Sequence, residues 1–247
     1  MRLPLLLSFV LLFSLSSEAQ KWHLFTEAGI VEPLETIEDQ GGTVTWSINT
    51  SPILVGGIQR RHRRIEQSLG YHFMKYWTTA PRWIDDNVGG TSSGPNYIHS
   101  LFYRLGVDLM KPDRRMAIVP NVQVRLGYLP DNKWDNNSVP LDSALLGYGS
   151  IGTVRNGDTV TLYSNFDYNR LMSDILFNVS AGLEFRFFNR KRINLSIIPQ
   201  YSHGLVLIHQ ADTWYTDFIK GKSGHAILTA HGSHIGVLGK LTLQLNK

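Results

Sequence analysis

Residues 181–201 alternate between apolar and polar side chains in the manner of an extended chain. Apolar residues hold most odd-numbered positions from Ala181 to Phe187 and again from Ile193 to Tyr201, and the polar stretch 189–192 separates the two runs. A period of two is that of a β-strand, and the short polar gap predicts a tight hairpin. The apolar face of such a hairpin packs either on the core of a soluble sandwich or against lipid.

The same alternation recurs along most of the chain. We expect eight strands, within residues 22–30, 44–58, 64–77, 101–109, 122–128, 175–187, 193–201 and 235–245. Pro52 is expected to kink the second segment. Several segments exceed ten residues, which is enough to cross a bilayer when the strand is tilted.

The connections between these segments alternate in length. The gaps after the second, fourth and sixth segments are short, whereas the gaps at about 31–42, 78–96, 129–171 and 206–231 are long. Outer-membrane barrels have this rhythm of tight periplasmic turns and long outer loops, and a soluble sandwich has no reason to keep it. The sequence therefore predicts an all-β fold, an antiparallel up-and-down transmembrane β-barrel in a bacterial outer membrane.

The longest gap leaves the number of strands open between eight and ten. Residues 159–166 alternate again and follow "ALLGYGSIG", with the turn sequence "RNGD" between the two stretches. This pair is either an outer hairpin that extends strands five and six or two further membrane-spanning strands. Gly147, Gly149 and Ser150 would make a poor lipid-facing surface, so we expect eight spanning strands.

The N-terminus resembles a secretory signal. Arg2 precedes a short apolar run, and Ser17-Glu18-Ala19 is a small-x-small cleavage site, which predicts a signal peptide at 1–19 and one barrel domain at 20–247. The run is too short to span a membrane as a helix. The chain has no Cys, so its stability must come from packing and hydrogen bonding, not from disulfides.

Charged residues of both signs occupy positions that face the predicted lumen. Four acids and four bases share this face: Glu27, Glu66, Asp108, Glu184, Arg104, Arg125, Arg186 and Lys240. An eight-stranded barrel is only wide enough to be filled by side chains. Because an uncompensated buried charge costs several kcal/mol, we expect these charges to pair and to plug the lumen. A gated channel for protons or ions is the alternative.

Basic residues concentrate in the three predicted short turns: Arg60, Arg61, Arg63, Arg64, Lys111, Arg114, Arg115, Arg190, Lys191 and Arg192. These turns are either simply solvated, or they meet anionic lipid headgroups or an acidic periplasmic or envelope protein. Nucleic acid is not an expected partner of hairpin turns in an exported chain.

Few residues point to catalysis. Ser202 and His203 lie near the end of a predicted strand, but neighbouring residues point to opposite faces, so Ser202 would need a base such as His234 or His72 from another strand. A lipid-modifying enzyme is therefore an alternative, and we expect no catalytic residue. Late histidines at 203, 209, 225, 231 and 234 match no metal-ligand spacing, and we expect no metal and no cofactor.

The chain resembles the small outer-membrane β-barrel proteins common in Bacteroidetes-type bacteria. The signal ending in Ala19-Gln20 and the stretch "PQYSHGLVLI" at 199–208, with Tyr201, Gly204 and Leu205, carry the resemblance. That family implies a barrel handled by the barrel assembly machinery, with no catalytic residues, and some members are implicated in assembling a secretion system. Such barrels usually end on an aromatic residue, whereas this chain ends Leu245-Asn246-Lys247, so either Leu245 substitutes or the machinery recognises the chain less well.

The expected function is accordingly non-enzymatic. We expect an envelope structural or binding protein, or an accessory to a transport or secretion assembly. Lipid surrounds the barrel, and Trp22, Trp77, Tyr97, Tyr128 and Tyr201 near the strand ends are expected to form interfacial girdles.

Overall fold

The computed structural model describes residues 21–40, 44–45, 50–77, 82–83, 95–110, 116–130, 133–134, 137–138, 144–155, 158–189, 192–218 and 221–245. Every regular element within these ranges is a β-strand. No helix in this part of the chain is long and apolar enough to cross a membrane. The signal peptide predicted at 1–19 lies outside the described residues.

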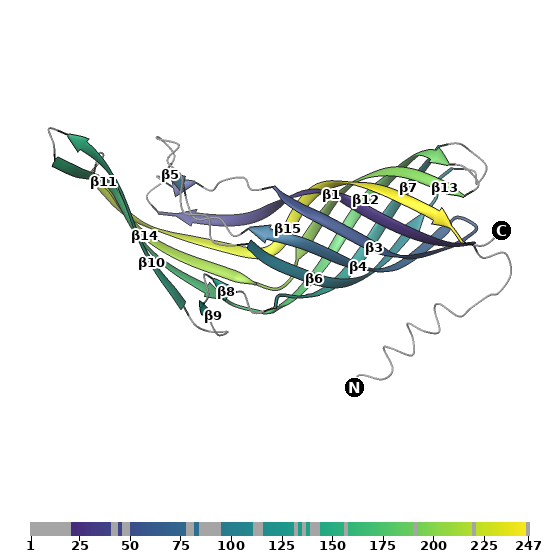
Figure 1. Ribbon diagram of the computed structural model, residues 1–247, viewed down its shortest axis with the longest axis horizontal. Coiled ribbons are helices and arrows are strands. Elements are labelled where there is room, and N and C mark those ends of the chain that lie inside the picture. Colours follow the sequence, from purple (N-terminus) through teal and green to yellow (C-terminus); the bar gives the residue numbers. More distant parts are fainter. Residues whose placement is uncertain are drawn as a thin grey trace.

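Eight strands form a closed antiparallel barrel, because the last of them pairs with the first (Figure 1). The barrel strands, in order around the cylinder, are β1 (Lys21–Asp39), β3 (Ser51–His62), β4 (Ile65–Trp77), β6 (Pro95–Val107), β7 (Ala117–Tyr128), β12 (Ile175–Asn189), β13 (Ile193–Gly204) and β15 (Lys222–Gln244). The predicted up-and-down barrel of eight strands is confirmed.

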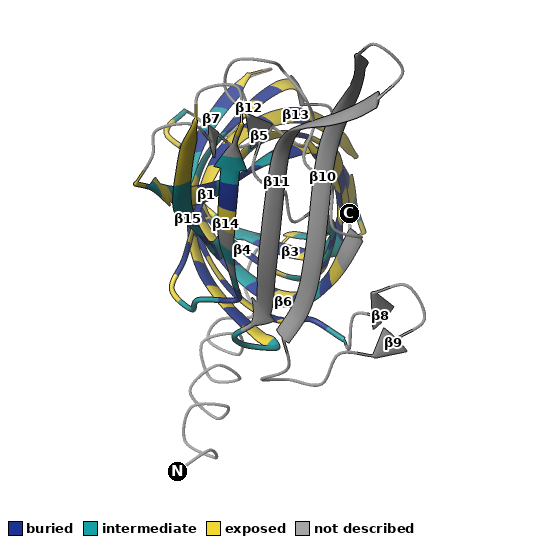
Figure 2. Cartoon of the chain, turned by 90° about the vertical axis from the view of Figure 1, so that its left-hand side faces the viewer, coloured by how far each residue is buried: buried dark blue, intermediate teal, exposed yellow. Residues whose placement is uncertain are grey.

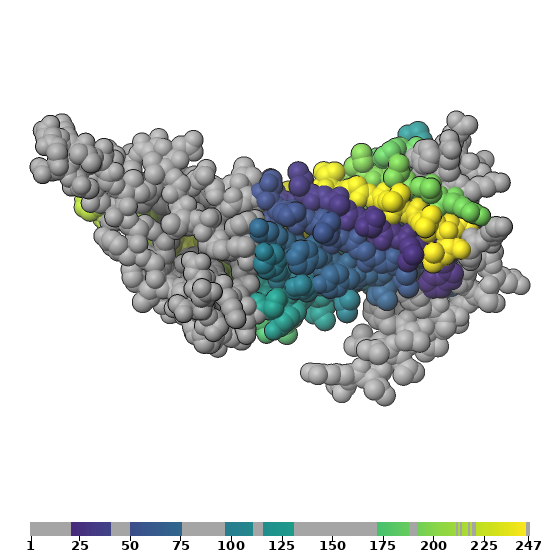
Figure 3. All heavy atoms as spheres, viewed as in Figure 1, coloured from purple at the N-terminus to yellow at the C-terminus, as the bar shows by residue number. Residues whose placement is uncertain are grey.

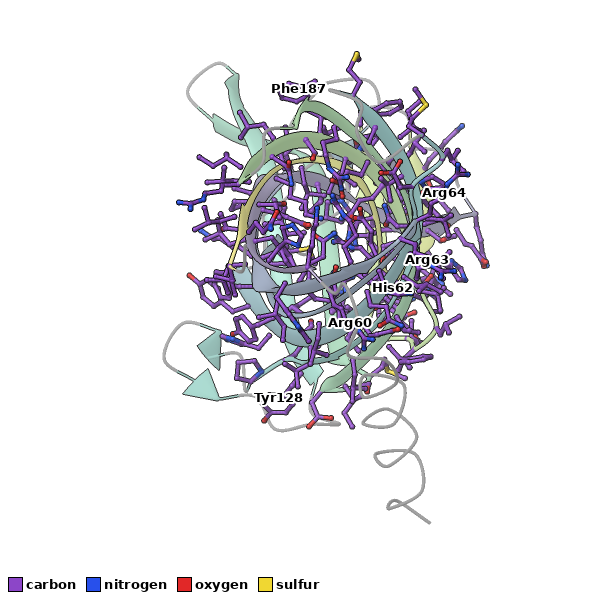
Figure 4. The ribbon with its side chains drawn as sticks, turned by 90° about the vertical axis from the view of Figure 1, so that its right-hand side faces the viewer. Arg60, His62, Arg63, Arg64, Tyr128 and Phe187 are labelled. Carbon is purple, nitrogen blue, oxygen red and sulfur yellow. The ribbon has the colours of Figure 1, made fainter. Side chains whose placement is uncertain are left out.

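Burial follows the alternation of the sequence. Along β13 every residue from Ile193 to Gly204 is exposed or buried in strict turn, and Figure 2 shows the same banding on the other barrel strands. The outward positions carry large apolar side chains such as Ile30 and Leu101, which are 61% and 64% exposed. Figure 4 shows Tyr128 and Phe187 pointing away from the barrel. An apolar surface of this extent is suited to lipid and not to water.

The outer surface is continuous between neighbouring strands. Figure 3 shows the side chains of β1, β3, β4 and β15 closing over one face of the barrel without a break. Tyr97, Tyr128 and Tyr201 are 41–50% exposed on the outside, as expected of interfacial girdle residues. The side chain of Trp77 lies outside the described residues.

Two barrel strands are longer than the sequence pattern predicted. β1 was expected to end at Ile30 but runs to Asp39, and β15 was expected to begin at Ile235 but begins at Lys222. The two remain paired with each other beyond the barrel, as far as Asp39 opposite Ala226. A strand that continues on a partner outside the membrane no longer needs the apolar alternation by which the membrane part was recognised.

Beyond the barrel, β15 carries an open sheet in the order β15-β14-β11-β10 (Figure 1). The remaining strands are β2 (Val44–Thr45), β5 (Arg82–Trp83), β8 (Lys133–Trp134), β9 (Asn137–Ser138), β10 (Ala144–Arg155), β11 (Asp158–Leu171) and β14 (His209–Asp217). We call the part formed by β10, β11, β14, the first half of β15 and the end of β1 the projecting sheet. It leaves the barrel at the end opposite the C-terminal end of β15.

The projecting sheet corrects several expectations about the long connections. The 206–231 connection contains β14. The hairpin predicted from "ALLGYGSIG" and residues 159–166 forms as β10 and β11, but it joins β14 and does not extend strands five and six. The segment predicted at 44–58 begins only at Ser51, and Val44–Thr45 instead pairs with Arg82–Trp83. These pairings join segments far apart in sequence, so local alternation does not reveal them.

A bulge marks the place where β15 changes partners. β15 pairs with β13 as far as His234 and with β14 from Ala230, and its register with β1 shifts between Leu34 and Glu35. Gly232 lies inside this bulge with a φ of 72°, a conformation that costs an L side chain about 1–2 kcal/mol. A Cβ at this position would also lie 2.5 Å from Leu176 Cδ1.

Candidate functional site in the barrel lumen

The lumen is filled in layers along the barrel axis. On β4 the inward residues begin with Glu66 beside the short β3–β4 turn and continue through His72 to Met74. At the level of Met74 lies a group of buried apolar side chains, which we call the apolar cap: Ile53, Met74, Ile98, Leu129, Leu176 and Ile208. The polar residues between this cap and the short turns form the candidate site.

Seven of the eight charges predicted for the lumen meet in one ionic network: Glu27, Glu66, Arg104, Asp108, Glu184, Arg186 and Lys240. All seven are at most 6% exposed. They come from β1, β4, β6, β12 and β15 and from the residue just beyond β6, so the network ties together strands from all around the barrel. These side chains can meet only because each strand pairs with its neighbours in a register that turns all of them toward the lumen.

Glu184 is the centre of the network. One of its carboxylate oxygens lies 2.8 Å from Arg186 Nη2 and the other lies 2.9 Å from Lys240 Nζ. Ser196 Oγ donates a further hydrogen bond of 2.8 Å to the first oxygen. Both cations therefore share one buried carboxylate, a geometry in which charge-assisted hydrogen bonds are strongest.

Two further carboxylates complete the pairing. Arg186 Nη2 lies 3.1 Å from Glu66 Oε2 and its Nη1 lies 3.8 Å from Asp108 Oδ2. Arg104 donates through Nη2 to Glu27 Oε2 at 2.9 Å and through Nε to Gln123 Oε1 at 3.0 Å.

Aromatic rings cover two of the cations. Lys240 Nζ lies 5.1 Å from the centroid of Phe25, and the guanidinium of Arg104 lies 5.2 Å from that of Phe102. These distances are within the range of cation–π attraction. The two rings also contact each other edge to face, with their centroids 6.3 Å apart.

Arg61 enters the network although it was predicted for a basic turn. Its side chain points into the lumen, and Nε lies 2.7 Å from Glu66 Oε1. It has the same odd numbering as the inward residues Ile53, Val55 and Gln59 of β3. The odd numbering of the inward residues of β3 was therefore the sequence signal that could have assigned Arg61 to the lumen.

With Arg61 included, four carboxylates meet four cations, and Arg125 is left out. Arg125 is 1% exposed and lies nearer the apolar cap, where Nη1 donates to His72 Nε2 at 2.6 Å and Nη2 donates to Ser202 Oγ at 3.2 Å. We call this group the Arg125 cluster: His72, Ser100, Arg125, Asn178, Ser180, Ser202 and His234. Within the part of the chain that the structure describes, Arg125 has no carboxylate partner.

Neutral hydrogen bonds organise the Arg125 cluster. Asn178 Nδ2 donates to Ser202 Oγ at 3.1 Å and to the carbonyl of Gly232 at 2.8 Å, and Ser180 Oγ donates to Ser202 Oγ at 3.0 Å. His234 lies opposite Ser202 in the β13–β15 ladder and bonds the Gly232 carbonyl through Nδ1. His203, by contrast, points outward, as the strand periodicity predicted.

The predicted basic turns are only partly within the described residues. Arg63 and Arg64 form the exposed β3–β4 turn at the barrel end shown in Figure 4, and Arg192 is exposed between β12 and β13. Arg60 was predicted for the turn as well, but it lies within β3 and is 4% exposed. The other predicted turn residues lie outside the described residues: Lys111, Arg114, Arg115, Arg190 and Lys191.

No group of three or more His, Asp or Glu side chains in the described ranges is arranged to hold a metal ion. That the protein holds neither a metal nor a cofactor stays a prediction from the sequence.

A closed eight-stranded antiparallel barrel with an apolar exterior and a polar, charge-paired lumen defines the class of bacterial outer-membrane β-barrel proteins. The fold thus places the chain in the outer membrane. No protein-family model matches the sequence, and no curated protein matches it.

Solved structures similar to this chain include three outer-membrane proteins. The outer membrane protein OprG from Pseudomonas aeruginosa is 8% identical, with a TM-score of 0.49 over 93% of this chain and 97% of that one. A major outer membrane protein from Thermus thermophilus is 10% identical (TM-score 0.45, 92% and 100% covered), and Neisserial surface protein A is 9% identical (TM-score 0.35, 92% and 100% covered). Likenesses this distant transfer no function, and the resemblance to Bacteroidetes-type barrels stays a prediction.

Proposed function

We propose that this chain is a non-enzymatic outer-membrane protein in which a plugged barrel anchors the projecting sheet for a structural or binding role in the cell envelope. The observation that carries the proposal is that the barrel lumen is filled while a sheet extends beyond the barrel. The lumen is filled by the ionic network and the apolar cap, whereas β1 and β15 stay paired beyond the barrel on the far side of the bulge.

The lengths of the turns support a position of the projecting sheet outside the cell. Short turns face the periplasm in bacterial outer-membrane barrels, and the two-residue β3–β4 turn lies at the end opposite the sheet. Exposed apolar side chains lie at Trp214 on β14 and at Phe218 just beyond its end, and they are 45% and 55% exposed. Apolar side chains outside the membrane are suited to a protein partner, including a component of a transport or secretion assembly.

The arrangement of Ser202 supports a non-enzymatic role. A serine nucleophile needs a base within hydrogen-bond reach and a path for its substrate. Ser202 has no exposed surface, and its Oγ is surrounded by Arg125, Asn178 and Ser180. No hydrogen bond joins it to His72 or His234 in the described part of the lumen. A lipid-modifying enzyme would lose its activity on Ser202→Ala, and we expect the membrane lipid profile to be unchanged by this substitution.

Site-specific photo-crosslinking in intact cells tests the binding role. A photoreactive residue at Trp214 or Phe218 should give a protein adduct of defined mass, because both side chains are exposed on the sheet. The same residue at Val122, which is 56% exposed on the lipid-facing side of β7, is the matched control and should give none. Identical adducts at all three positions, or none on the sheet, would argue against the proposal.

A further inference from the structure

Arg125 differs from the other lumen cations in having no carboxylate to neutralise it. Arg61, Arg104, Arg186 and Lys240 each contact at least one acid. Arginine remains protonated in proteins, so burial cannot remove its charge. Its two partners, His72 and Ser202, accept hydrogen bonds but bring no negative charge.

A buried charge without a counter-charge is costly. The penalty for leaving one partner of a buried ion pair uncompensated is about 3–5 kcal/mol. All four carboxylates of the ionic network are already engaged by its four cations. The barrel therefore carries one positive charge near the apolar cap for which the described residues supply no balance.

Unpartnered polar atoms lie in the same cluster. Arg125 Nε and Ser100 Oγ are buried donors without a hydrogen-bond partner. Ser100 lies opposite His72 on β4 and opposite Gly127 on β7, two residues along the strand from Arg125. Both donors therefore lie on the β6–β7 side of the lumen. The unpartnered acceptors are Asn178 Oδ1, on β12 directly opposite Arg125, and His234 Nε2, on β15. Because an acceptor repels an anion, the anion is favoured against the two donors, Arg125 Nε and Ser100 Oγ.

The surroundings limit the size of a ligand. The apolar cap lies toward the projecting sheet, and Phe102, Ile198 and Leu238, all at most 2% exposed, lie further along their strands than Ser100, Ser202 and His234, toward the short turns. The polar walls are short side chains, mainly Ser100, Asn178, Ser180 and Ser202. Surroundings that are buried to this degree suit a small ion and exclude a nucleotide, a sugar or a lipid headgroup.

We propose that the Arg125 cluster binds one small monovalent anion, of the size of chloride, as an internal counter-ion beside Arg125 Nε and Ser100 Oγ. The single negative charge balances the single unpaired guanidinium. This ion stabilises the folded barrel, and its binding does not depend on the function proposed for the projecting sheet.

Bromide diffraction on the unmodified full-length protein tests the position of the ion. Crystals grown from detergent with bromide in place of chloride should show an anomalous peak in contact with Arg125 and Ser100. A lumen without such a peak, or a peak found only on the surface, would overturn the proposal. This measurement needs no substitution and so does not depend on a variant that folds.

Anion-dependent unfolding tests the energetics. At constant ionic strength, replacing gluconate with chloride should stabilise the wild-type barrel in detergent micelles. Above the dissociation constant, each tenfold rise in chloride should lower the unfolding equilibrium constant about tenfold. Arg125→Gln should remove this dependence, and Arg64→Gln, in the exposed β3–β4 turn, should keep it.

If Arg125→Gln does not fold, Ser100→Ala is the alternative variant. It removes one of the two donors to the ion, so it should weaken the stabilisation by chloride. Equal stability of the wild type in chloride and gluconate, or a response in Arg125→Gln as large as in the wild type, would contradict the proposal.

Discussion

Glu184 shows how one side chain can hold a lumen together. It pairs with Arg186 on its own strand and with Lys240 on β15. Glu184→Ala leaves both cations with a more distant acid and should lower the free energy of unfolding by roughly 3–5 kcal/mol. Urea unfolding in phospholipid vesicles measures this loss. Glu38→Ala, at an exposed position of β1, should change stability by less than about 0.5 kcal/mol, and equal effects would refute the central role of Glu184.

Two adjacent glycines of β3 allow a matched test of packing. A Cβ on Gly57 would lie 2.4 Å from the Leu69 carbonyl oxygen and 2.7 Å from Gly70 Cα, whereas a Cβ on Gly56 would meet nothing closer than 4.0 Å. Gly57→Ala should therefore cost about 1–3 kcal/mol, and Gly56→Ala should be neutral or slightly stabilising. Denaturant unfolding midpoints of the two variants measure these changes in stability. A larger loss of stability in Gly56→Ala than in Gly57→Ala would be inconsistent with the packing.

His209, on β14 outside the barrel, should make stability depend on pH. Burial lowers the pKa of its imidazole to about 4 from the ordinary value of 6.5. Between these values the unfolded chain binds the extra proton, so the free energy of unfolding falls as pH drops from 6.5 to 4, by up to about 3 kcal/mol. His209→Gln should flatten this slope in unfolding titrations at several pH values. A slope equal to that of the wild type would show that His209 is not responsible.

At the scale of elements, the membrane barrel and the β10–β11 hairpin are separable. Among the strands that the structure describes, the hairpin pairs only with β14. The Leu129 amide donates to the Asp174 carbonyl at 2.7 Å and so brings the ends of β7 and β12 together. Replacing residues 131–172 with an Asn-Gly turn should leave a folded barrel, because no barrel strand loses its neighbour. Heat-modifiable migration on gels checks folding, and loss of the fast-migrating form would mean that the hairpin is needed.

The same division explains which elements were predictable from sequence. Alternation found all eight barrel strands because a lipid-facing residue and a lumen-facing residue must differ at every step. It missed β14 and the ends of β1 and β15, because those strands pair with each other outside the membrane and need no apolar face. Alternation correctly predicted that the seven charges of the ionic network face the lumen. Which of them pair depends on the height of each residue along the barrel axis, and alternation does not give that height. For that reason Arg125 could not be told from Arg104 without the register.

The whole molecule is a barrel whose exterior is solvated by lipid and whose interior is filled by paired charges near the short turns and by the apolar cap nearer the projecting sheet. A lumen filled by packed side chains distinguishes a membrane anchor from a channel of the same fold. An eight-stranded barrel has room only for side chains, and here buried side chains at both levels fill that room.

Single-channel recording in planar lipid bilayers tests this closure most directly. Wild-type protein, first shown to be folded by its heat-modifiable migration, should give no conductance steps above the lipid baseline. Lys240→Ala opens one layer of the lumen but leaves the apolar cap, so it should remain silent as well. Regular conductance steps from the folded wild type, shifted in size by Arg104→Ala or Arg125→Ala, would contradict the account and establish a channel.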